Sequence, residues 1–150
     1  LTIVGAGMGA TVGLNWTLVD WSAPPLATGK QGQDVKAIAL VSPQWSYEGM
    51  PLAPAMNHPG VRQQVSMFIA FGDREQSYKR DAERIFKIAE RFHPPYDPSQ
   101  GKEKQEVFLF PHSTSVQGGE LLLREPAVGF AFREFIENPV AKQNWPWIER

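Results

Sequence analysis

Cysteine is absent from the 150 residues of this chain. Without a thiol, the protein cannot contain a disulfide, a zinc site with thiolate ligands or a cysteine nucleophile. The chain also lacks an excess of one charge, because 15 lysines and arginines face 16 aspartates and glutamates, a formal net charge of −1. A strongly basic nucleic-acid-binding protein is therefore not expected.

Long hydrophobic runs are missing as well. The longest mostly apolar stretch, residues 1–14, is too short to span a bilayer, and no basic region precedes it as in a signal peptide. We therefore expect no membrane-spanning segment, and we infer no compartment. Because the chain opens with Leu1 and enters an apolar run at once, we expect a fragment or a processed chain.

What is present is a globular composition, with 42% hydrophobic and 21% charged residues. The length fits one domain over residues 1–150. Thirteen prolines and thirteen glycines imply many turns, which argues against a long helical bundle.

Apolar runs and helical periodicity alternate along the chain. Strands are predicted over residues 1–4, 35–41, 65–71 and 107–110. Helices are predicted over residues 11–21, from a Ser77 cap to Phe92, and over 121–123 and 128–136. The first of these helices is apolar nearly all round, which predicts deep packing. Residues 44–64 are expected to be irregular, with room for one helical turn.

This alternation predicts an α/β fold with an open, mainly parallel sheet and helices on both faces. Ligands of such sheets bind beyond the carboxyl ends of the strands. A site is therefore expected in the loops that start at Gly5, Ser42, Gly72 and Pro111.

The glycine run at residues 5–10 allows three interpretations. Gly5, Gly7 and Ala10 match the G-x-G-x-x-G/A turn that binds FAD or NAD, but the second strand ends in Ser42 and Pro43 without the expected acidic residue. The run also fits a nucleophile elbow, G-x-S-x-G, with Gly7 in the place of serine. A plain tight turn is the third interpretation.

The order and spacing of four segments resemble the C-terminal half of an α/β-hydrolase, over residues 1–9, 35–43, 65–77 and 107–122. The resemblance implies an esterase-like serine hydrolase fold whose first four strands precede residue 1, so that residues 1–150 form a partial domain. It places the nucleophile at Gly7, the acid at Glu75 (or Asp73), and the catalytic histidine at Gln117. Glycine has no nucleophile and glutamine is no base at neutral pH, so the resemblance implies a pseudoenzyme with a binding or scaffolding role.

Further residues of this resemblance would surround a pocket. The Met8 backbone N–H would be one oxyanion-hole donor, while the second would come from a loop outside this chain. Ser42 could bind a small-molecule ligand or satisfy turn backbone groups. Trp45 could line an apolar cavity or cover the edge of the sheet.

The histidines suggest one alternative chemistry. His112 could act as a displaced base that, with Glu75 or Asp73, activates water for ester hydrolysis, or it could simply be exposed or hydrogen-bonded. His58 and His93 are predicted to be surface residues. No histidine spacing indicates a metal site, and no cofactor is expected.

The first strand is expected to lack a neighbour on one side. An unpaired apolar edge needs either the missing N-terminal half or a partner strand, and otherwise favours aggregation or dimerisation.

Overall fold

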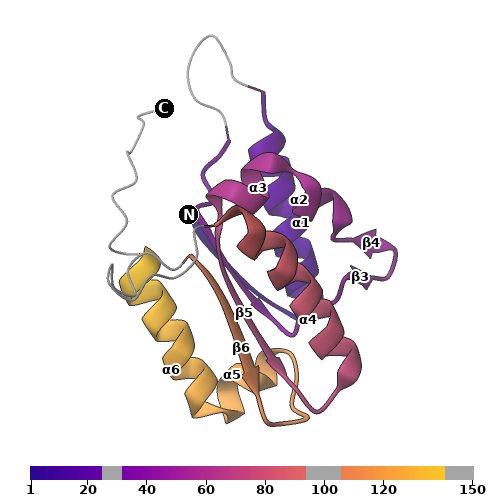
Figure 1. The fold of residues 1–150 in the computed structure, drawn as a ribbon, viewed down its shortest axis with the longest axis vertical. Helices are drawn as coiled ribbons and strands as arrows, with labels where there is room; N and C mark the ends of the chain where they lie inside the picture. Colours follow the sequence, from indigo (N-terminus) through magenta and orange to yellow (C-terminus); the bar gives the residue numbers. More distant parts are fainter. Residues whose placement is uncertain (25–31, 94–105, 141–150) are drawn as a thin grey trace.

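The computed structural model describes residues 1–24, 32–93 and 106–140. Its centre is a four-stranded parallel sheet in the order β1-β2-β5-β6 (Figure 1). The strands are β1 (Thr2–Ala6), β2 (Ala37–Val41), β5 (Ser66–Gly72) and β6 (Val107–His112). The prediction of an α/β fold with a mainly parallel sheet is confirmed.

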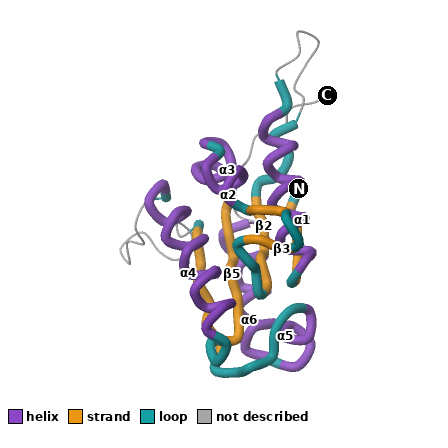
Figure 2. Tube along the Cα trace, turned by 90° about the vertical axis from the view of Figure 1, so that its right-hand side faces the viewer, coloured by secondary structure: helices purple, strands orange, loops and turns teal. Residues whose placement is uncertain are grey.

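Helices cover both faces of this sheet, as predicted. One face carries α1 (Met8–Ser22), α2 (Ala53–Asn57), α3 (Pro59–Gln64) and α4 (Gln76–Ala89), followed by the short η1 (Glu90–Phe92). The other face carries α5 (Gly119–Arg124), α6 (Pro126–Phe135) and η4 (Ile136–Val140). Figure 2 shows α2 and α3 at one end of the sheet and α5 at the other.

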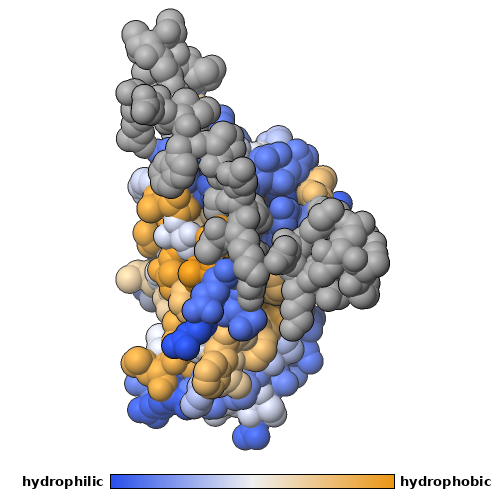
Figure 3. Space-filling model, turned by 90° about the vertical axis from the view of Figure 1, so that its left-hand side faces the viewer, coloured by the Kyte–Doolittle hydropathy of each residue, from blue (hydrophilic) through white to orange (hydrophobic). Residues whose placement is uncertain are grey.

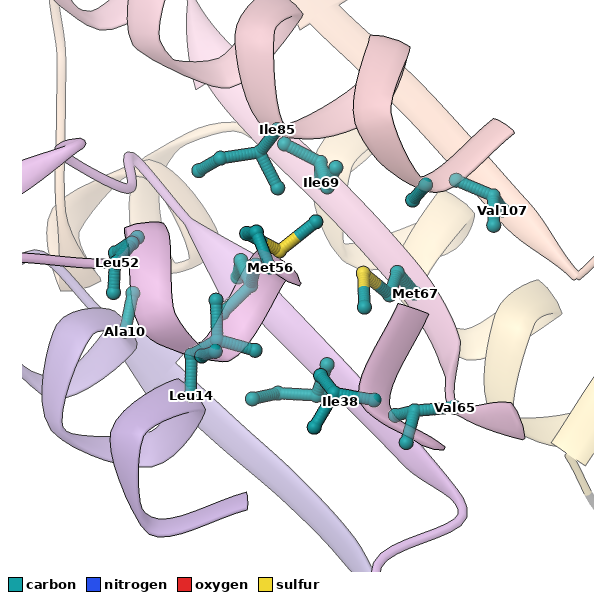
Figure 4. Packing of buried hydrophobic residues seen from close by; sticks show 14 of the residues in the cluster. Ala10, Leu14, Ile38, Leu52, Met56, Val65, Met67, Ile69, Ile85 and Val107 are labelled. Carbon is teal, nitrogen blue, oxygen red and sulfur yellow. The ribbon is translucent and has the colours of Figure 1, made fainter. Parts of the chain in front are cut away.

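The two central strands supply the core. Every residue of β2 and β5 is buried, and their side chains alternate between the two faces. Toward the α1 side, the larger side chains of the strands meet those of the covering helices (Figure 4); they include Ile38, Met67, Ile69, Leu14, Met56 and Ile85. The continuous burial explains why these strands read as uniform apolar runs.

The prediction that α1 is deeply packed all round is wrong. Met8, Val12, Trp16 and Val19 are exposed, whereas the opposite flank is buried around Leu14. Within the described residues, α2 and α3 cover one flank of α1 and nothing covers the other. The small number of charged residues in a helix therefore does not imply that the helix is buried on all sides.

Two further local predictions are corrected. Ser77 does not cap α4, because the helix begins at Gln76 and Ser77 already lies within it. The N-cap residue is Glu75, whose side chain forms no capping hydrogen bond. Residues 44–64 are not irregular: β3 (Ser46–Tyr47) and β4 (Met50–Pro51) form a small antiparallel hairpin, and α2 and α3 follow. Prolines in the first turn of both helices are compatible with helix formation, since those N–H groups have no helical acceptor.

Residues 25–31, 94–105 and 141–150 lie outside the described residues. Among the helices that are described, none has the length and apolar character that crossing a membrane requires. Figure 3 views the molecule from the left-hand side of Figure 1 and shows hydrophobic residues gathered over part of that surface.

Candidate functional site: the carboxyl-terminal edge of the sheet

The four strands end side by side, which brings the four predicted loops to one edge. Ala6 pairs with Val41, Val41 with Ala70, and Gly72 with His112. The residues that follow these strand ends are called the rim below: Gly7, Ser42, residues 72–75, and residues 112–118. The rim is where an open parallel sheet binds its ligands.

The glycine run forms a sharp turn from β1 into α1. Gly7 has φ +54° and ψ −121°, a conformation that strains any residue with a Cβ, and its N–H donates to the carbonyl of Val41 at 2.9 Å. A Cβ on Gly5 would collide with the Gly9 carbonyl and lie 2.7 Å from the Ala10 Cα. A Cβ on Gly7 would meet nothing within 4 Å. The turn therefore leaves room for a side chain at residue 7, where the protein has none.

Gln117 forms hydrogen bonds at the ends of both β2 and β5. Its Oε1 accepts hydrogen bonds from the Ser42 hydroxyl at 2.8 Å and the Gly72 N–H at 3.1 Å, while its Nε2 donates to the Gly72 carbonyl at 2.8 Å. A primary amide suits this position because one planar group offers both a donor and an acceptor to Gly72. Gln117 thus closes the rim between two strands.

Ser42 belongs to the same network. It is fully buried with φ +50°, its hydroxyl accepts a hydrogen bond from the Gly118 N–H at 2.8 Å, and its own N–H donates to the Ala70 carbonyl at 2.7 Å. A serine at positive φ is uncommon, and these bonds stabilise it there. Of its two predicted roles, the structure shows the satisfaction of turn backbone groups.

His112 has a different carboxylate partner from the predicted ones. Its Nε2 lies 2.9 Å from Oε2 of Glu125, and because a carboxylate only accepts, the imidazole N–H donates. Both side chains are about one-quarter exposed, and the His112 ring stacks on Phe110. Sequence reasoning missed Glu125, whose only local signal is an acidic residue at the start of a helix.

Neither predicted acid reaches an imidazole in the described part of the chain. Glu75 is exposed at the N-cap of α4. Asp73 is half-buried, and its backbone N–H donates a hydrogen bond to the backbone carbonyl of His112 at 2.9 Å. Gly7, Gln117 and these acids therefore do not assemble into a nucleophile, a base and an orienting acid.

The two other pocket candidates lie at different places. Met8 is the first residue of α1 and is half-exposed, and the N–H groups of a first helical turn have no acceptor within the helix. Trp45 packs against α4: its backbone N–H donates to Asp81 Oδ2 at 3.0 Å, and the Arg84 guanidinium lies 3.7 Å from the centroid of its ring. Trp45 thus anchors the β3–β4 hairpin on α4.

The prediction that His93 lies on the surface is wrong. Its side chain is buried, and Nδ1 lies 2.6 Å from Glu106 Oε2, which joins the end of η1 to the start of β6. His58 is partly buried, with its Nδ1 shielded from solvent. Among the described residues, no three histidines or acids gather as a metal site would require.

Comparison with known proteins adds no relative: no family model, no curated protein and no solved structure matches this chain. The class of the protein therefore follows from its own sheet, which is an open parallel α/β sheet with helices on both faces.

Proposed function

We propose that this chain is an α/β-hydrolase-like domain that has lost serine-hydrolase chemistry and acts in binding or scaffolding. Four parallel strands that neighbour one another in chain order support the likeness, and so does the sharp turn after the first of them, where Gly7 has a φ that would strain a residue with a Cβ. One observation carries the loss of chemistry. Gln117, at the position expected for the base, uses its side-chain amide in hydrogen bonds to Ser42 and Gly72.

The chemistry that acyl transfer needs is missing at the two positions where the resemblance expects the nucleophile and the base. A serine hydrolase requires an oxygen nucleophile and a base within hydrogen-bond reach of it. Gly7 offers only hydrogen, and the Gln117 amide does not usefully accept a proton. The Ser42 hydroxyl donates to an amide oxygen, which cannot activate it.

Scaffolding is the role that this network supports best. The polar side chains at the centre of the rim are bonded to one another, so a ligand would have to break those bonds before using them. A small-molecule ligand would instead meet the start of α1, where the backbone N–H of Met8 has no acceptor within the helix, while the Ala10 N–H already donates to the Gly7 carbonyl.

The proposal is tested with a fluorophosphonate probe on the purified 150-residue protein. We expect no stoichiometric labelling, while an active serine hydrolase in the same reaction is labelled fully. Ser42→Ala is the matched variant, since any labelling of Ser42 must vanish in it. Stoichiometric labelling of a single serine, located by mass spectrometry, would refute the loss of chemistry.

One observation favours a second candidate function, which is ester hydrolysis by a water molecule that His112 activates. The carboxylate of Glu125 could orient the imidazole, as an acid does in a hydrolase. Under this alternative, the protein turns over short acyl esters, His112→Ala abolishes turnover and His58→Ala does not. We expect no turnover in any of the three proteins.

A FAD or NAD site at residues 5–10 is the remaining alternative. Ser42 ends β2 where a ribose-binding acid is expected, and it is buried in the Gln117 network. We therefore expect purified protein without flavin absorbance and without heat of binding on titration with NAD. Saturable binding of either cofactor would favour this alternative instead.

A further inference from the structure

Helix α4 and its continuation η1 carry a line of basic side chains, called the basic row below. The row consists of four exposed residues at spacings of four, three and four, which a helix places on one side: Arg80, Arg84, Lys87 and Arg91. Ala82, Ile85 and Ala89, which α4 buries, lie on the opposite side. Figure 2 shows α4 at an outer side of the molecule. The basic row therefore runs along the solvent side of the helix.

Two guanidinium groups of the basic row are held in place by the protein. The Arg84 guanidinium lies over the Trp45 ring, 3.7 Å from its centroid, and a guanidinium stacked in this way keeps the N–H groups at its edge available to a carboxylate. Arg80 Nε donates to Asp81 Oδ1 at 3.2 Å, and the Arg80 side chain is still 76% exposed. Because these side chains are already ordered, binding an anion costs less side-chain entropy than it would for free arginines.

The other half of the basic row has no partner within the described part of the chain. Lys87 and Arg91 form no ion pair, hydrogen bond or ring contact with a described residue. Together, α4 and η1 contain five basic and three acidic residues, a formal charge of +2, whereas the whole chain has −1. Positive charge is thus concentrated on this one element, where it attracts an anionic group.

The basic row is only one side chain wide. Glu83 and Glu90 lie next to it on one flank of the helix, and Asp81 lies on the other. These carboxylates would repel the broad surface of phosphates that a nucleic acid or an anionic membrane presents. A helix that binds lipid also needs apolar side chains beside its cations, but the Phe92 ring at the end of the row carries the Arg62 guanidinium at 4.1 Å. A narrow line of acidic groups fits better.

The spacing along the basic row indicates the shape of such a line. At about 1.5 Å of rise per residue, its members lie about 6, 4.5 and 6 Å apart along the axis, and the row spans roughly 16.5 Å. A second helix with acidic residues at spacings of four, three and four has the same intervals. An extended strand turns a side chain to the same face about every 6.7 Å, so four of them span about 20 Å and lose register with the row.

We propose that the basic row docks an acidic helical segment of a partner protein, with aspartates or glutamates in one line at spacings of four, three and four. Arg80 and Arg84 each donate to a carboxylate, and Lys87 and Arg91 continue the contact over two further turns. The inference rests on the scaffolding role proposed above and names the kind of partner for it. No rim residue belongs to the basic row, so the fluorophosphonate probe tests the loss of chemistry without touching this contact.

The test measures the binding of two fluorescein-labelled helical peptides to the 150-residue protein by fluorescence anisotropy. The first peptide has four glutamates at spacings of four, three and four in an alanine-rich sequence. The second has the same composition, with its glutamates distributed around the helix. At about 50 mM NaCl we expect the first peptide to bind at least about fivefold more tightly than the second, and its binding to weaken as the salt concentration rises.

Matched charge reversals locate the contact. Lys87→Glu/Arg91→Glu removes no contact to a described residue, and it should weaken binding of the first peptide at least about tenfold with an unchanged circular dichroism spectrum. Arg124→Glu/Arg133→Glu makes the same change of charge at exposed positions of α5 and α6, and its binding should stay within about threefold of the wild type. Arg84→Lys keeps the charge but loses the planar group, so we expect binding about two- to threefold weaker.

Three outcomes would overturn the proposal. The first is no binding of the first peptide up to about 1 mM protein at low salt. The second is equal binding of the two peptides, or binding that Lys87→Glu/Arg91→Glu leaves unchanged. The third is tighter binding of a uridine oligonucleotide or of phosphatidylserine vesicles that is lost in Lys87→Glu/Arg91→Glu, because it would assign the basic row to a nucleic acid or a membrane.

Discussion

At the scale of single residues, the turn at 5–9 shows that three neighbouring glycines serve different needs. Gly5 is required by space, because a Cβ there would collide with the Gly9 carbonyl. Gly7 is required by conformation, because its φ is +54° although the space around it is open. Gly9 has neither constraint, since it lies within α1 and a Cβ there would meet nothing within 4 Å.

This difference predicts opposite effects of one substitution at two positions. Gly5→Ala should lower the free energy of unfolding by about 1–3 kcal/mol, because strand and helix must move apart to admit a methyl group. Gly9→Ala should leave it unchanged or raise it by about 0.5–1 kcal/mol, since alanine is the better helix former. Urea denaturation of both variants measures this, and equal effects would contradict the packing described for the turn.

At the scale of elements, hydrogen bonds between segments far apart in the chain hold the rim together. Gln117 joins its loop to β2 and β5 across 75 and 45 residues, and His112 joins the end of β6 to the start of α6 through Glu125. These bonds position loops that follow different strands. They therefore hold the loops of the rim in place relative to one another.

The contribution of the His112–Glu125 contact can be measured by a double-mutant cycle. We expect a coupling free energy of about 0.2–1 kcal/mol between His112→Ala and Glu125→Ala, because both side chains are partly exposed to water. The Glu120–Arg124 pair of α5 is the comparison, and its greater exposure should place its coupling at the low end of this range. No measurable coupling between His112 and Glu125 would show that the contact does not hold β6 to α6.

At the scale of the whole molecule, two separate cores lie on the two faces of one sheet. The core toward α1 and α4 is mainly aliphatic, whereas the other is built around the ring of Phe68. That ring lies 5.7–6.3 Å, centroid to centroid, from three aromatic neighbours: Phe110, Phe132 and Phe135. Helix α6 is held on the sheet largely through these contacts.

Removal of this central ring should destabilise the whole domain. Phe68→Ala is expected to lower the free energy of unfolding by about 3–5 kcal/mol, since it leaves a cavity where four rings meet. Phe130→Ala on the outer side of α6 is the control, and its effect should stay within about 0.5 kcal/mol. Denaturation followed by circular dichroism distinguishes the two, and a small effect of Phe68→Ala would contradict the aromatic core.

The sequence predicted the sheet well and the packing of its surroundings less well. The four runs predicted as strands form the four parallel strands, with ends that differ by no more than two residues. For the two central strands, β2 and β5, the uniform apolar character follows directly from burial on both faces. Residues 44–64 were harder, since short helices that begin with proline have little periodicity. The exposed stripe of α1 could not be foreseen, because an apolar helix looks the same whether or not a neighbour covers it.

The sequence by itself determined which chemical groups the site can contain. Glycine at residue 7, glutamine at residue 117 and the lack of cysteine are facts of the sequence, and no fold can add a hydroxyl, an imidazole or a thiol at those positions. Only the tertiary structure decided which groups meet: Gln117 with Ser42 and Gly72, His112 with Glu125, and His93 with Glu106. The physical reason is that hydrogen bonds act over about 3 Å, so partners far apart in the chain meet only after the strands have aligned.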